Sequence, residues 1–369
     1  MLYKDFKDIR LSALGMGNMR LPQTEANNPN APIDWVEAHK IIDRAYEAGI
    51  NYFDTAYVYN AGESEKCLGA CMKKHPRDTF YLATKFYIDA NPDYKAVFEE
   101  QLERLETDHI DFYLLHCLMD SNIDNYLNSG AIDYFLKMKE EGKIRYLGFS
   151  SHASVETLER FASHHDWDFA QIQLNYYDWL YSTTKQEYEI LEKHGIKTMV
   201  MEPVRGGRLS ALSEDADALL KSVHPEWSIS SWALRFVQSL PNVQVILSGM
   251  STMDQMEDNL KTFSSECSLS EEDKEIAFKA AEMFRSKLVV PCTGCCYCTE
   301  GCPMGINIPE WLKIYNAFKS DGSFIGKPMA DAMEGPGPDD CIECGNCTGH
   351  CPQGIDTPKV MKELVELIK

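Results

Sequence analysis

Strand-like and helix-like patterns alternate over roughly 250 of the 369 residues of this chain. The expected strands are Leu11–Gly15, Asn51–Thr55, Phe80–Thr84, Asp111–His116, Tyr146–Ser150, Phe169–Asn175, Lys197–Glu202 and Gln244–Ser248. The helical patterns between them are Asp34–Gly49, Tyr94–Glu106, Ile132–Glu141, Val155–His164, Thr184–His194 and Ile229–Ser239. This alternation predicts a parallel sheet, and the strand count favours a closed (β/α)8 TIM barrel. An open doubly wound sheet is the alternative, but Gly15-Met16-Gly17 lacks the third glycine of its fingerprint.

Three successive strands of this pattern end in ionisable residues. Asp54 ends the second strand, with Tyr59 in the loop after it, and Lys85 and His116 end the next two strands. Alone, such an aspartate usually caps a helix, such a histidine is a satisfied polar group, and such a lysine lies on the surface. Because active sites of β/α barrels form at the carboxyl ends of the strands, the joint placement predicts one active site.

Nine of the 13 cysteines lie between Cys292 and Cys351, and eight of them form two matching runs. The runs are Cys292-x2-Cys295-x2-Cys298-x3-Cys302-Pro303 and Cys341-x2-Cys344-x2-Cys347-x3-Cys351-Pro352. Each has the spacing of bacterial ferredoxins, which bind a 4Fe–4S cluster. Zinc is the alternative, since paired CxxC motifs supply four ligands per ion, but the third cysteine and the Cys-Pro ending favour iron–sulfur. We therefore expect two 4Fe–4S clusters.

The ligands of these clusters are expected to cross between the runs, because two-cluster ferredoxins exchange their fourth cysteine. The first cluster would then take Cys292, Cys295, Cys298 and Cys351, and the second Cys341, Cys344, Cys347 and Cys302. Cys296 is left over and is expected to be a free buried thiol.

A change of composition near Val290 predicts two domains, a barrel over residues 1–289 and an iron–sulfur domain over residues 290–369. Helices are expected at Ser270–Leu288, Ile308–Phe318 and Pro358–Ile368. The smaller domain is thus mostly α-helical and resembles the helical two-cluster ferredoxins.

The net charge of −21 argues against nucleic acid or an anionic membrane as a partner. The sequence has no segment of 18 uncharged apolar residues, so we expect no membrane span. The first residues lack the apolar core of a signal peptide. Clustered cysteines in a long chain without a secretory signal indicate metal in a reducing compartment, so we expect a cytoplasmic protein.

Residues 5–265 resemble the aldo-keto reductase family. The resemblance rests on FDTAYVY followed by GESEKCLG, and on ATK, LLH, GFSSH and AQIQLN in the family's order. It implies a nicotinamide-dependent oxidoreductase with a catalytic tetrad that falls on Asp54, Tyr59, Lys85 and His116. Tyr57 is a rival tyrosine, but its offset from the aspartate does not match the family.

The tetrad has a physical rationale, because carbonyl reduction needs a proton on oxygen as well as a hydride on carbon. A tyrosine is a poor acid at neutral pH, and a nearby lysine ammonium lowers its pKa. Buried Lys85 needs a counter-charge, which Asp54 supplies. His116 can hydrogen-bond the substrate oxygen and share its developing charge.

The resemblance also implies the nicotinamide contacts. It places Ser150 and Gln171 under the carboxamide, Ser151 or His152 nearby, and Asn18 close to the ribose. The loop Ser248–Asn259 would meet the adenine end through Gln255 and Asn259, yet it has three acids and no Lys or Arg before Asn259 to bind a 2′-phosphate. Met201 stands where many members have a stacking aromatic. NAD is therefore slightly favoured over NADP, with Arg205 or Arg208 as an alternative source of a cation.

These features lead to two hypotheses. One is an oxidoreductase that interconverts a small carbonyl compound and an alcohol, coupled through its clusters to a redox partner protein. The other is an electron-transfer or redox-sensing protein whose barrel no longer transfers hydride. A purely structural role of the clusters is a third option. The sequence contains no motif that identifies the substrate, the oligomeric state or a bound flavin. A hydride carries two electrons, whereas each cluster passes one at a time, and a flavin could link the two processes.

Overall fold

The computed structural model describes residues 1–25, 31–266, 268–286, 289–321 and 323–368. Its chain forms two compact units. The barrel unit comprises residues 1–204 and 226–278, and the cysteine unit comprises residues 205–225 and 279–369. The cysteine unit thus includes a segment that lies within the barrel's sequence. The division into domains 1–289 and 290–369 was expected from composition, and it stays a prediction about the domain boundary.

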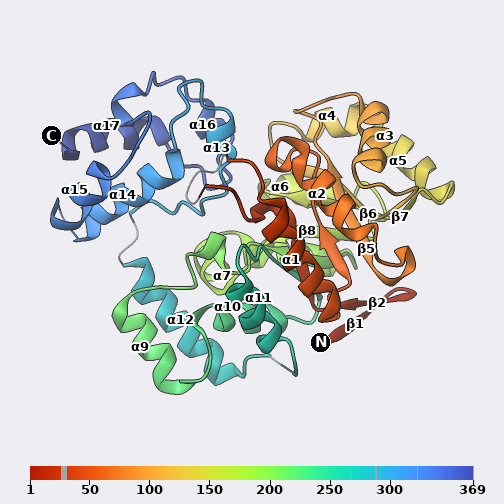
Figure 1. The fold of residues 1–369 in the computed structure, drawn as a ribbon, viewed down its shortest axis with the longest axis horizontal. Helices are drawn as coiled ribbons and strands as arrows, with labels where there is room; N and C mark the ends of the chain where they lie inside the picture. The colour runs from red at the N-terminus through yellow and green to blue at the C-terminus, as the bar shows by residue number, and fades with distance from the viewer. Residues whose placement is uncertain (26–30, 267, 287–288, 322, 369) are drawn as a thin grey trace. The chain divides into compact units, whose positions relative to one another are not determined.

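The barrel unit has the predicted (β/α)8 fold (Figure 1). Its parallel strands close in the order β10-β3-β4-β5-β6-β7-β8-β9. Their bounds are β3 Leu14–Gly17, β4 Tyr52–Asp54, β5 Tyr81–Phe86, β6 Ile110–Leu118, β7 Ile144–Ser151, β8 Phe169–Gln173, β9 Lys197–Met201 and β10 Val243–Ser248.

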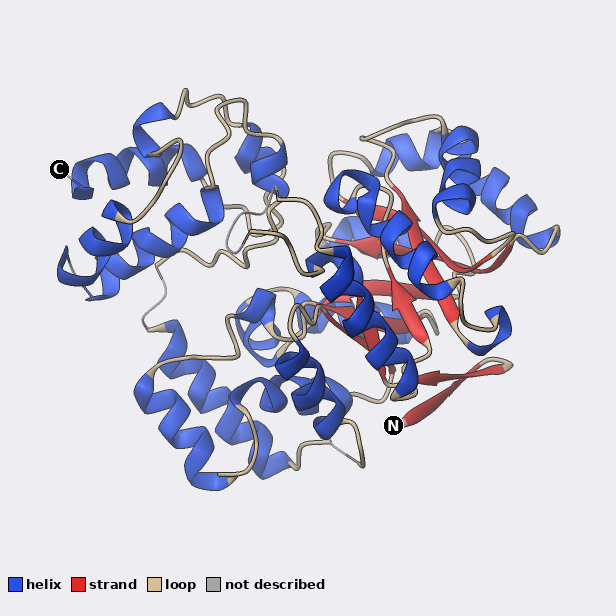
Figure 2. Cartoon of the chain, viewed as in Figure 1, coloured by secondary structure: helices blue, strands red, loops and turns tan. Residues whose placement is uncertain are grey.

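Helices cover the outside of this barrel, as Figure 2 shows in blue around the red strands. The predicted ones are α1 Trp35–Glu47, α3 Tyr94–Arg104, α5 Ala131–Glu140, α6 Val155–Ala162, α8 Thr184–Lys193, α10 Ile229–Gln238 and α12 Glu271–Arg285. Asp34 caps α1 by accepting from the amides of Val36 and Glu37, as its sequence position indicated. Among the described residues of the barrel unit, the sequence did not predict the α-helices α2 Glu63–Met72, α4 Ile123–Asn128, α7 Tyr176–Tyr181 and α11 Met253–Thr262.

The predicted first strand, Leu11–Gly15, is wrong in its extent. Its residues are divided between β3 and β2 (Ile9–Ser12), which pairs antiparallel with β1 (Tyr3–Phe6). Ser12 turns the chain between them, because its amide donates to the Asn51 side chain at 2.7 Å and its hydroxyl donates to the Leu14 carbonyl at 2.7 Å. One continuous apolar run does not reveal where a strand changes partner.

The β1–β2 hairpin contributes to the core inside the barrel. Phe6 meets Tyr146 edge to face, with ring centroids 5.1 Å apart. Phe6, Ile9 and Leu11 pack with strand residues Tyr52, Ala83, Phe112, Leu114, Tyr146, Phe169, Met199, Val245 and Leu247. Because Tyr52 begins β4 and Phe169 begins β8, this packing fills the amino-terminal part of the barrel and leaves the carboxyl ends of the strands for polar groups.

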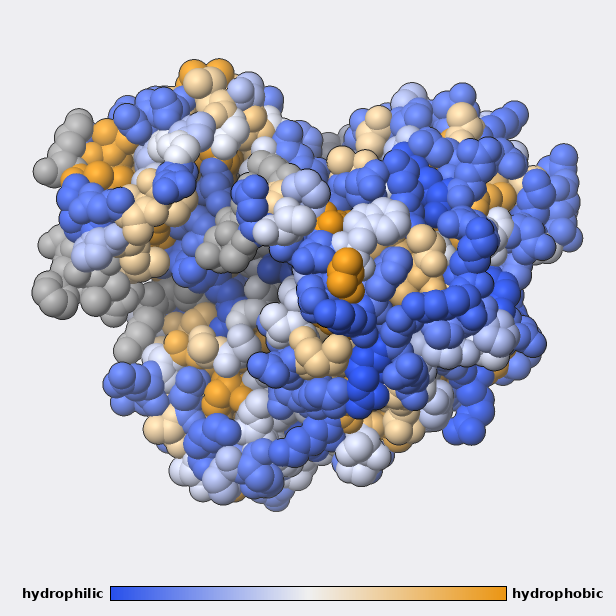
Figure 3. All heavy atoms as spheres, viewed as in Figure 1, coloured by the Kyte–Doolittle hydropathy of each residue, from blue (hydrophilic) through white to orange (hydrophobic). Residues whose placement is uncertain are grey.

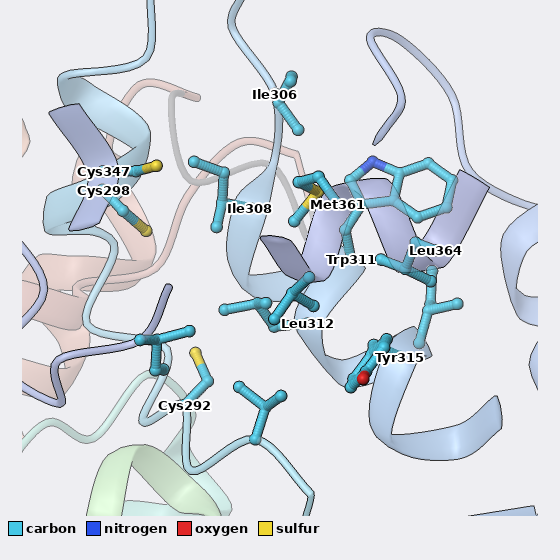
Figure 4. Close-up of a cluster of buried hydrophobic side chains, with 14 of the residues drawn as sticks. Cys292, Cys298, Ile306, Ile308, Trp311, Leu312, Tyr315, Cys347, Met361 and Leu364 are labelled. Atoms are coloured by element: carbon cyan, nitrogen blue, oxygen red, sulfur yellow. The ribbon is translucent and has the colours of Figure 1, made fainter. Parts of the chain in front are cut away.

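The cysteine unit is helical, as predicted. Its elements are η4 Arg205–Gly207, α9 Glu214–Val223, the end of α12, α13 Tyr297–Glu300, α14 Ile308–Asp321, α15 Ser323–Asp331, η5 Pro338–Asp340, α16 Asn346–Gly349 and α17 Thr357–Ile368. Figure 4 shows its core, where Trp311 and Tyr315 of α14 lie with Met361 and Leu364 of α17. Each fully buried side chain of this size stabilises the fold by about 1.5–3 kcal/mol.

The visible face in Figure 3 is mostly hydrophilic, with apolar residues singly or in small groups, as expected for a chain of net charge −21. Within the described ranges, no helix combines the length and the apolarity that crossing a membrane requires.

Candidate active site and cysteine-lined cavities

A buried ion pair joins the ends of β4 and β5. Lys85 is 0% exposed, and its Nζ donates to Asp54 Oδ1 and to the Thr55 carbonyl, each at 2.6 Å. Burial lowers the pKa of Lys85 and raises the pKa of Asp54, and the charge of each partner opposes the shift of the other. A buried pair is retained only when its geometry is good, because desolvation of both charges costs several kcal/mol. The ammonium is therefore held at a defined point.

Tyr59 and His116 lie beside this pair. Lys85 Nζ is 4.8 Å from the centroid of the Tyr59 ring, and the Tyr59 and His116 ring centroids are 5.7 Å apart. Burial, followed by the charge of Lys85, lowers the pKa of His116 well below its usual value, so the imidazole is neutral at neutral pH. Its buried Nδ1 has no hydrogen-bond partner among the described residues, which favours the proton on Nε2.

Tyr57, the rival tyrosine, points elsewhere. Its hydroxyl donates to Glu100 Oε2 at 2.9 Å, and the guanidinium of Arg104 lies 4.3 Å from its ring centroid. The structure therefore brings together Asp54, Tyr59, Lys85 and His116 and leaves Tyr57 outside the group.

A buried network behind the site had no prediction. Arg104 on α3 donates to the Tyr57 carbonyl and to Glu65 Oε2, each at 3.0 Å. Gln101 Nε2 donates to Glu65 Oε1 at 2.8 Å and to the Lys85 carbonyl at 3.0 Å. These bonds hold the loop before Tyr59 and the end of β5 in one frame. Glu65 is buried on α2. The periodicity of the sequence does not distinguish it from an acid on the surface, so this network could not be predicted.

The residues expected under the carboxamide lie across β7 and β8. Ser150 is directly opposite Gln171 in the sheet register, and both are buried. Ser150 Oγ accepts from the Cys117 amide at 2.8 Å, and Ser151 Oγ accepts from the Ala153 amide at 3.2 Å. Gln171 Oε1 is buried without a hydrogen-bond partner among the residues the structure describes. A primary amide on a ligand would satisfy this acceptor, so the residues fit a nicotinamide.

Asn18 lies after β3, as the expected ribose contact requires. Its Nδ2 donates to the Asp54 carbonyl at 2.9 Å, which ties it to the ion pair. The Oδ1 of Asn18, like the Oε1 of Gln171, is buried and has no hydrogen-bond partner within the described part of the chain.

The segment Ser248–Asn259, expected to be a loop, is a loop only between the end of β10 at Ser248 and the start of α11 at Met253. Its electrostatic surroundings also differ from what its three acids alone suggest. Asn259 Nδ2 donates to Ser248 Oγ at 2.7 Å, and Gln255 Oε1 accepts from the Ser251 amide at 2.8 Å. Two of its acids are engaged, since Glu257 pairs with Arg44 at 2.6 Å and Asp258 accepts from Ser228 at 2.6 Å. Arg20, which the sequence reading missed, lies against this loop: its carbonyl accepts from Ser251 and its Cβ adjoins Gly249.

The two cysteine runs repeat one backbone conformation. Left-handed residues recur at matched positions: Gly294 and Glu343, Cys296 and Gly345, Gly305 and Gly354. Each run then forms a four-residue helix, α13 or α16, and these helices are neighbours (Figure 1). Cys296 occupies the left-handed position, φ 67°, that its repeat mate fills with glycine. It is half-buried, so the expectation of a buried thiol is wrong, because this position keeps it at the cavity wall.

The eight run cysteines line two separate cavities. One is bordered by Cys302 together with Cys341, Cys344 and Cys347. The other is bordered by Cys351 together with Cys292, Cys295, Cys298 and the extra Cys296. In the described ranges, no three His, Cys, Asp or Glu side chains converge on a single-ion site. Leaving Cys296 aside, four thiols border each cavity, and four thiolates are the donor set that a 4Fe–4S cluster takes, so the residues fit this group.

Arg205 and Arg208, the alternative cations for a nucleotide phosphate, belong to the cysteine unit. Arg205 Nη2 donates to the Pro291 carbonyl at 3.0 Å and to Gln353 Oε1 at 3.4 Å. Burial lowers the pKa of Arg208, and the neighbouring Cys292 side chain opposes this shift. Both guanidinium groups are thus directed at residues of the first cysteine run and its cavity.

The comparisons with known proteins agree with this geometry. A model described as the aldo/keto reductase family matches residues 13–277, and a model of the 4Fe-4S dicluster domain matches residues 291–355. The uncharacterized oxidoreductase YqkF of Bacillus subtilis (strain 168) is 27% identical over 303 residues, covering 73% of this chain and 92% of its own. L-galactose dehydrogenase of Arabidopsis thaliana is 26% identical over 281 residues, covering 68% and 84%.

Among solved structures, the holo form of aldo-keto reductase AKR11C1 from Bacillus halodurans aligns with a TM-score of 0.64 and 27% identity, over 76% of this chain and 96% of that one. The family match spans most of the chain and coincides with the barrel. The chain therefore belongs to the aldo/keto reductase family and is an oxidoreductase that carries a C-terminal 4Fe-4S domain.

Proposed function

We propose that this protein interconverts a small carbonyl compound and an alcohol with a nicotinamide nucleotide, and that its two cysteine-lined cavities each hold a 4Fe–4S cluster that exchanges electrons with a redox partner. The observation that carries the first part is the convergence of Asp54, Tyr59, Lys85 and His116 at the ends of neighbouring strands. The observation that carries the second is the division of the eight cysteines into two sets of four.

In the direction of carbonyl reduction, a nicotinamide nucleotide would supply the hydride, and the chain's own residues manage the proton. The clusters would pass single electrons to or from a redox partner, outside this step. Tyr59 donates its hydroxyl proton to the carbonyl oxygen. The Lys85 ammonium stabilises the phenolate that remains, and Asp54 keeps that ammonium charged in a buried site. Neutral His116 donates a hydrogen bond to the same oxygen and orients it.

Gln171 and Ser150 are the residues proposed to bind the carboxamide. The unpartnered Gln171 Oε1 accepts from the amide nitrogen, and the Ser150 hydroxyl, which already accepts from a backbone amide, donates to the amide oxygen. Asn18 Oδ1 is the matching acceptor for a ribose hydroxyl. Together these contacts present one face of the ring to the substrate.

Protein reconstituted anaerobically is expected to contain about eight irons and about eight acid-labile sulfides per chain. The decisive experiment is titration of this protein with NADH or NADPH while the cluster absorbance and the reduction of an aldehyde panel are followed. Aldehyde reduction supports the first part of the proposal, and reversible bleaching of the clusters by dithionite supports the second, because the hydride carries both of its electrons to the carbonyl carbon. Bleaching by dithionite with no reduction of any aldehyde favours an electron-transfer protein. One or two zinc ions without sulfide would contradict the cluster assignment.

Cofactor choice gives a second test. We propose that NADP binds no better than NAD, because the loop Ser248–Asn259 has no cation for a 2′-phosphate before Asn259. Gln255→Arg should strengthen NADP binding selectively by about 1–2 kcal/mol through one charge-assisted contact. Fluorescence titration of both nucleotides measures this, and Gln255→Met, which loses the bond to Ser251 without adding charge, is the control.

A wild-type preference of about tenfold for NADPH would overturn this reading of the loop, since tenfold corresponds to about 1.4 kcal/mol. Arg20→Gln would then locate the missing cation, because Arg20 adjoins the loop at Gly249 and Ser251.

A further inference from the structure

The segment between β9 and α10 is part of the cysteine unit although it lies within the barrel's sequence. It begins at Arg205, whose side chain is 1% exposed despite its charge. The guanidinium donates to the carbonyl of Pro291, the residue before Cys292, and to Gln353, which lines the first cavity. The buried Arg205 guanidinium therefore contacts the residue before Cys292 and the second residue after Cys351, and these two cysteines belong to the same expected cluster.

Arg208 follows three residues later, and its amide donates to the Arg205 carbonyl at 3.1 Å. Burial lowers the pKa of the Arg208 side chain, whereas the neighbouring Cys292 side chain and the Glu310 carboxylate raise it. The positive charge of Arg205 lowers the pKa of Arg208 further. Cys292 is an expected ligand of the first cluster.

We propose that Arg205 and Arg208 form a fixed positive site at the first cavity, bounded by Cys292, Cys295, Cys298 and Cys351, and raise the reduction potential of the cluster held there. This rests on the proposed binding of a cluster. Four thiolates around an iron–sulfide core leave the site anionic, and reduction adds one electron and no proton. A fixed cation therefore stabilises the reduced form more than the oxidised form.

Hydrogen bonds to the ligand sulfurs act in the same direction, because they stabilise electron density on sulfur. At the second cavity, burial raises the pKa of Cys347, and the groups that oppose this shift are neutral: the Thr357 hydroxyl and the backbone amide and hydroxyl of Thr348. A cationic neighbour of Cys292 thus contrasts with the neutral groups around Cys347, and it comes from the segment that follows β9 in the chain.

The test is a mediated redox titration of the full holoprotein, followed by electron paramagnetic resonance, without nicotinamide or substrate. Arg208→Gln should lower one of the two midpoint potentials by at least a tenfold change in the reduction equilibrium constant, about 59 mV for one electron. Arg208→Lys keeps the charge and should retain most of the potential. Lys319→Gln removes an exposed cation that pairs with Glu363 at 3.4 Å, and should shift neither potential.

Unchanged potentials in Arg208→Gln with full iron content would overturn the proposal, as would an equal shift of both potentials. If Arg208→Gln fails to retain the first cluster, Arg208→Lys decides: retention supports a role of charge, and loss shows a role in packing instead. Iron analysis of the wild type distinguishes failure of this inference from failure of the cluster assignment, and the missing nucleotide makes the result independent of barrel activity.

Discussion

Replacing Tyr59 with phenylalanine is expected to lower kcat for carbonyl reduction by a factor of about 10²–10⁴ and to leave nucleotide affinity unchanged. The change removes one hydroxyl and preserves the ring that lies 4.8 Å from Lys85 Nζ and 5.7 Å from His116. Because the hydroxyl provides the proton only as the carbonyl accepts hydride, its loss affects the transition state more than the bound substrate. Steady-state kinetics with a reducible aldehyde and fluorescence titration with nucleotide measure the two quantities.

Tyr57→Phe is the matched control, since it removes a hydroxyl two residues away. That hydroxyl donates to Glu100 and does not approach the ion pair. A small reduction in kcat is expected, because the Tyr57 carbonyl and ring still contact Arg104. If Tyr57→Phe were the more damaging of the two, the proton donor would be Tyr57 and the geometry of the site in solution would differ from that described above.

The alternation of strands and helices made the barrel and the convergence at its mouth predictable. In a closed parallel barrel all strands end at one rim, so residues as far apart as Asp54 and His116 approach each other by topology alone. The resemblance to the aldo-keto reductase family, through the offset between Asp54 and Tyr59, selected one of two tyrosines, and the structure places that one beside Lys85. Periodicity and strand order therefore account for the convergence of the strand ends, and the resemblance accounts for the choice of tyrosine.

The supporting residues were not predictable in this way. Glu65 and Arg104 pair across α2 and α3, and nothing in either helix alone distinguishes this buried pair from two surface charges. The hairpin β1–β2 was missed because a strand that leaves the barrel has the same apolar pattern as one that enters it. Arg205 and Arg208 were candidates for binding a nucleotide phosphate, because the sequence of a loop does not reveal which structural unit it packs with, and both residues belong to the cysteine unit.

Replacing Cys302 with alanine is expected to remove the cluster built on the other cysteine run. Iron should fall from about eight to about four per chain, because Cys302 lines the cavity of Cys341, Cys344 and Cys347 rather than that of its own run. Alanine is preferable to serine, whose oxygen can still bind iron. Cys296→Ala is the matched control and should retain all the iron, since Cys351 completes the first set without it.

Pairs of variants show which cluster remains. Adding Cys344→Ala to Cys302→Ala should cause no further loss of iron, because both residues belong to one cavity, whereas adding Cys295→Ala should remove the other cluster as well. If each run instead held its own cluster, the two double variants would behave in the opposite way. The iron count therefore distinguishes the crossed from the uncrossed arrangement without any assumption about which cluster gives which spectrum.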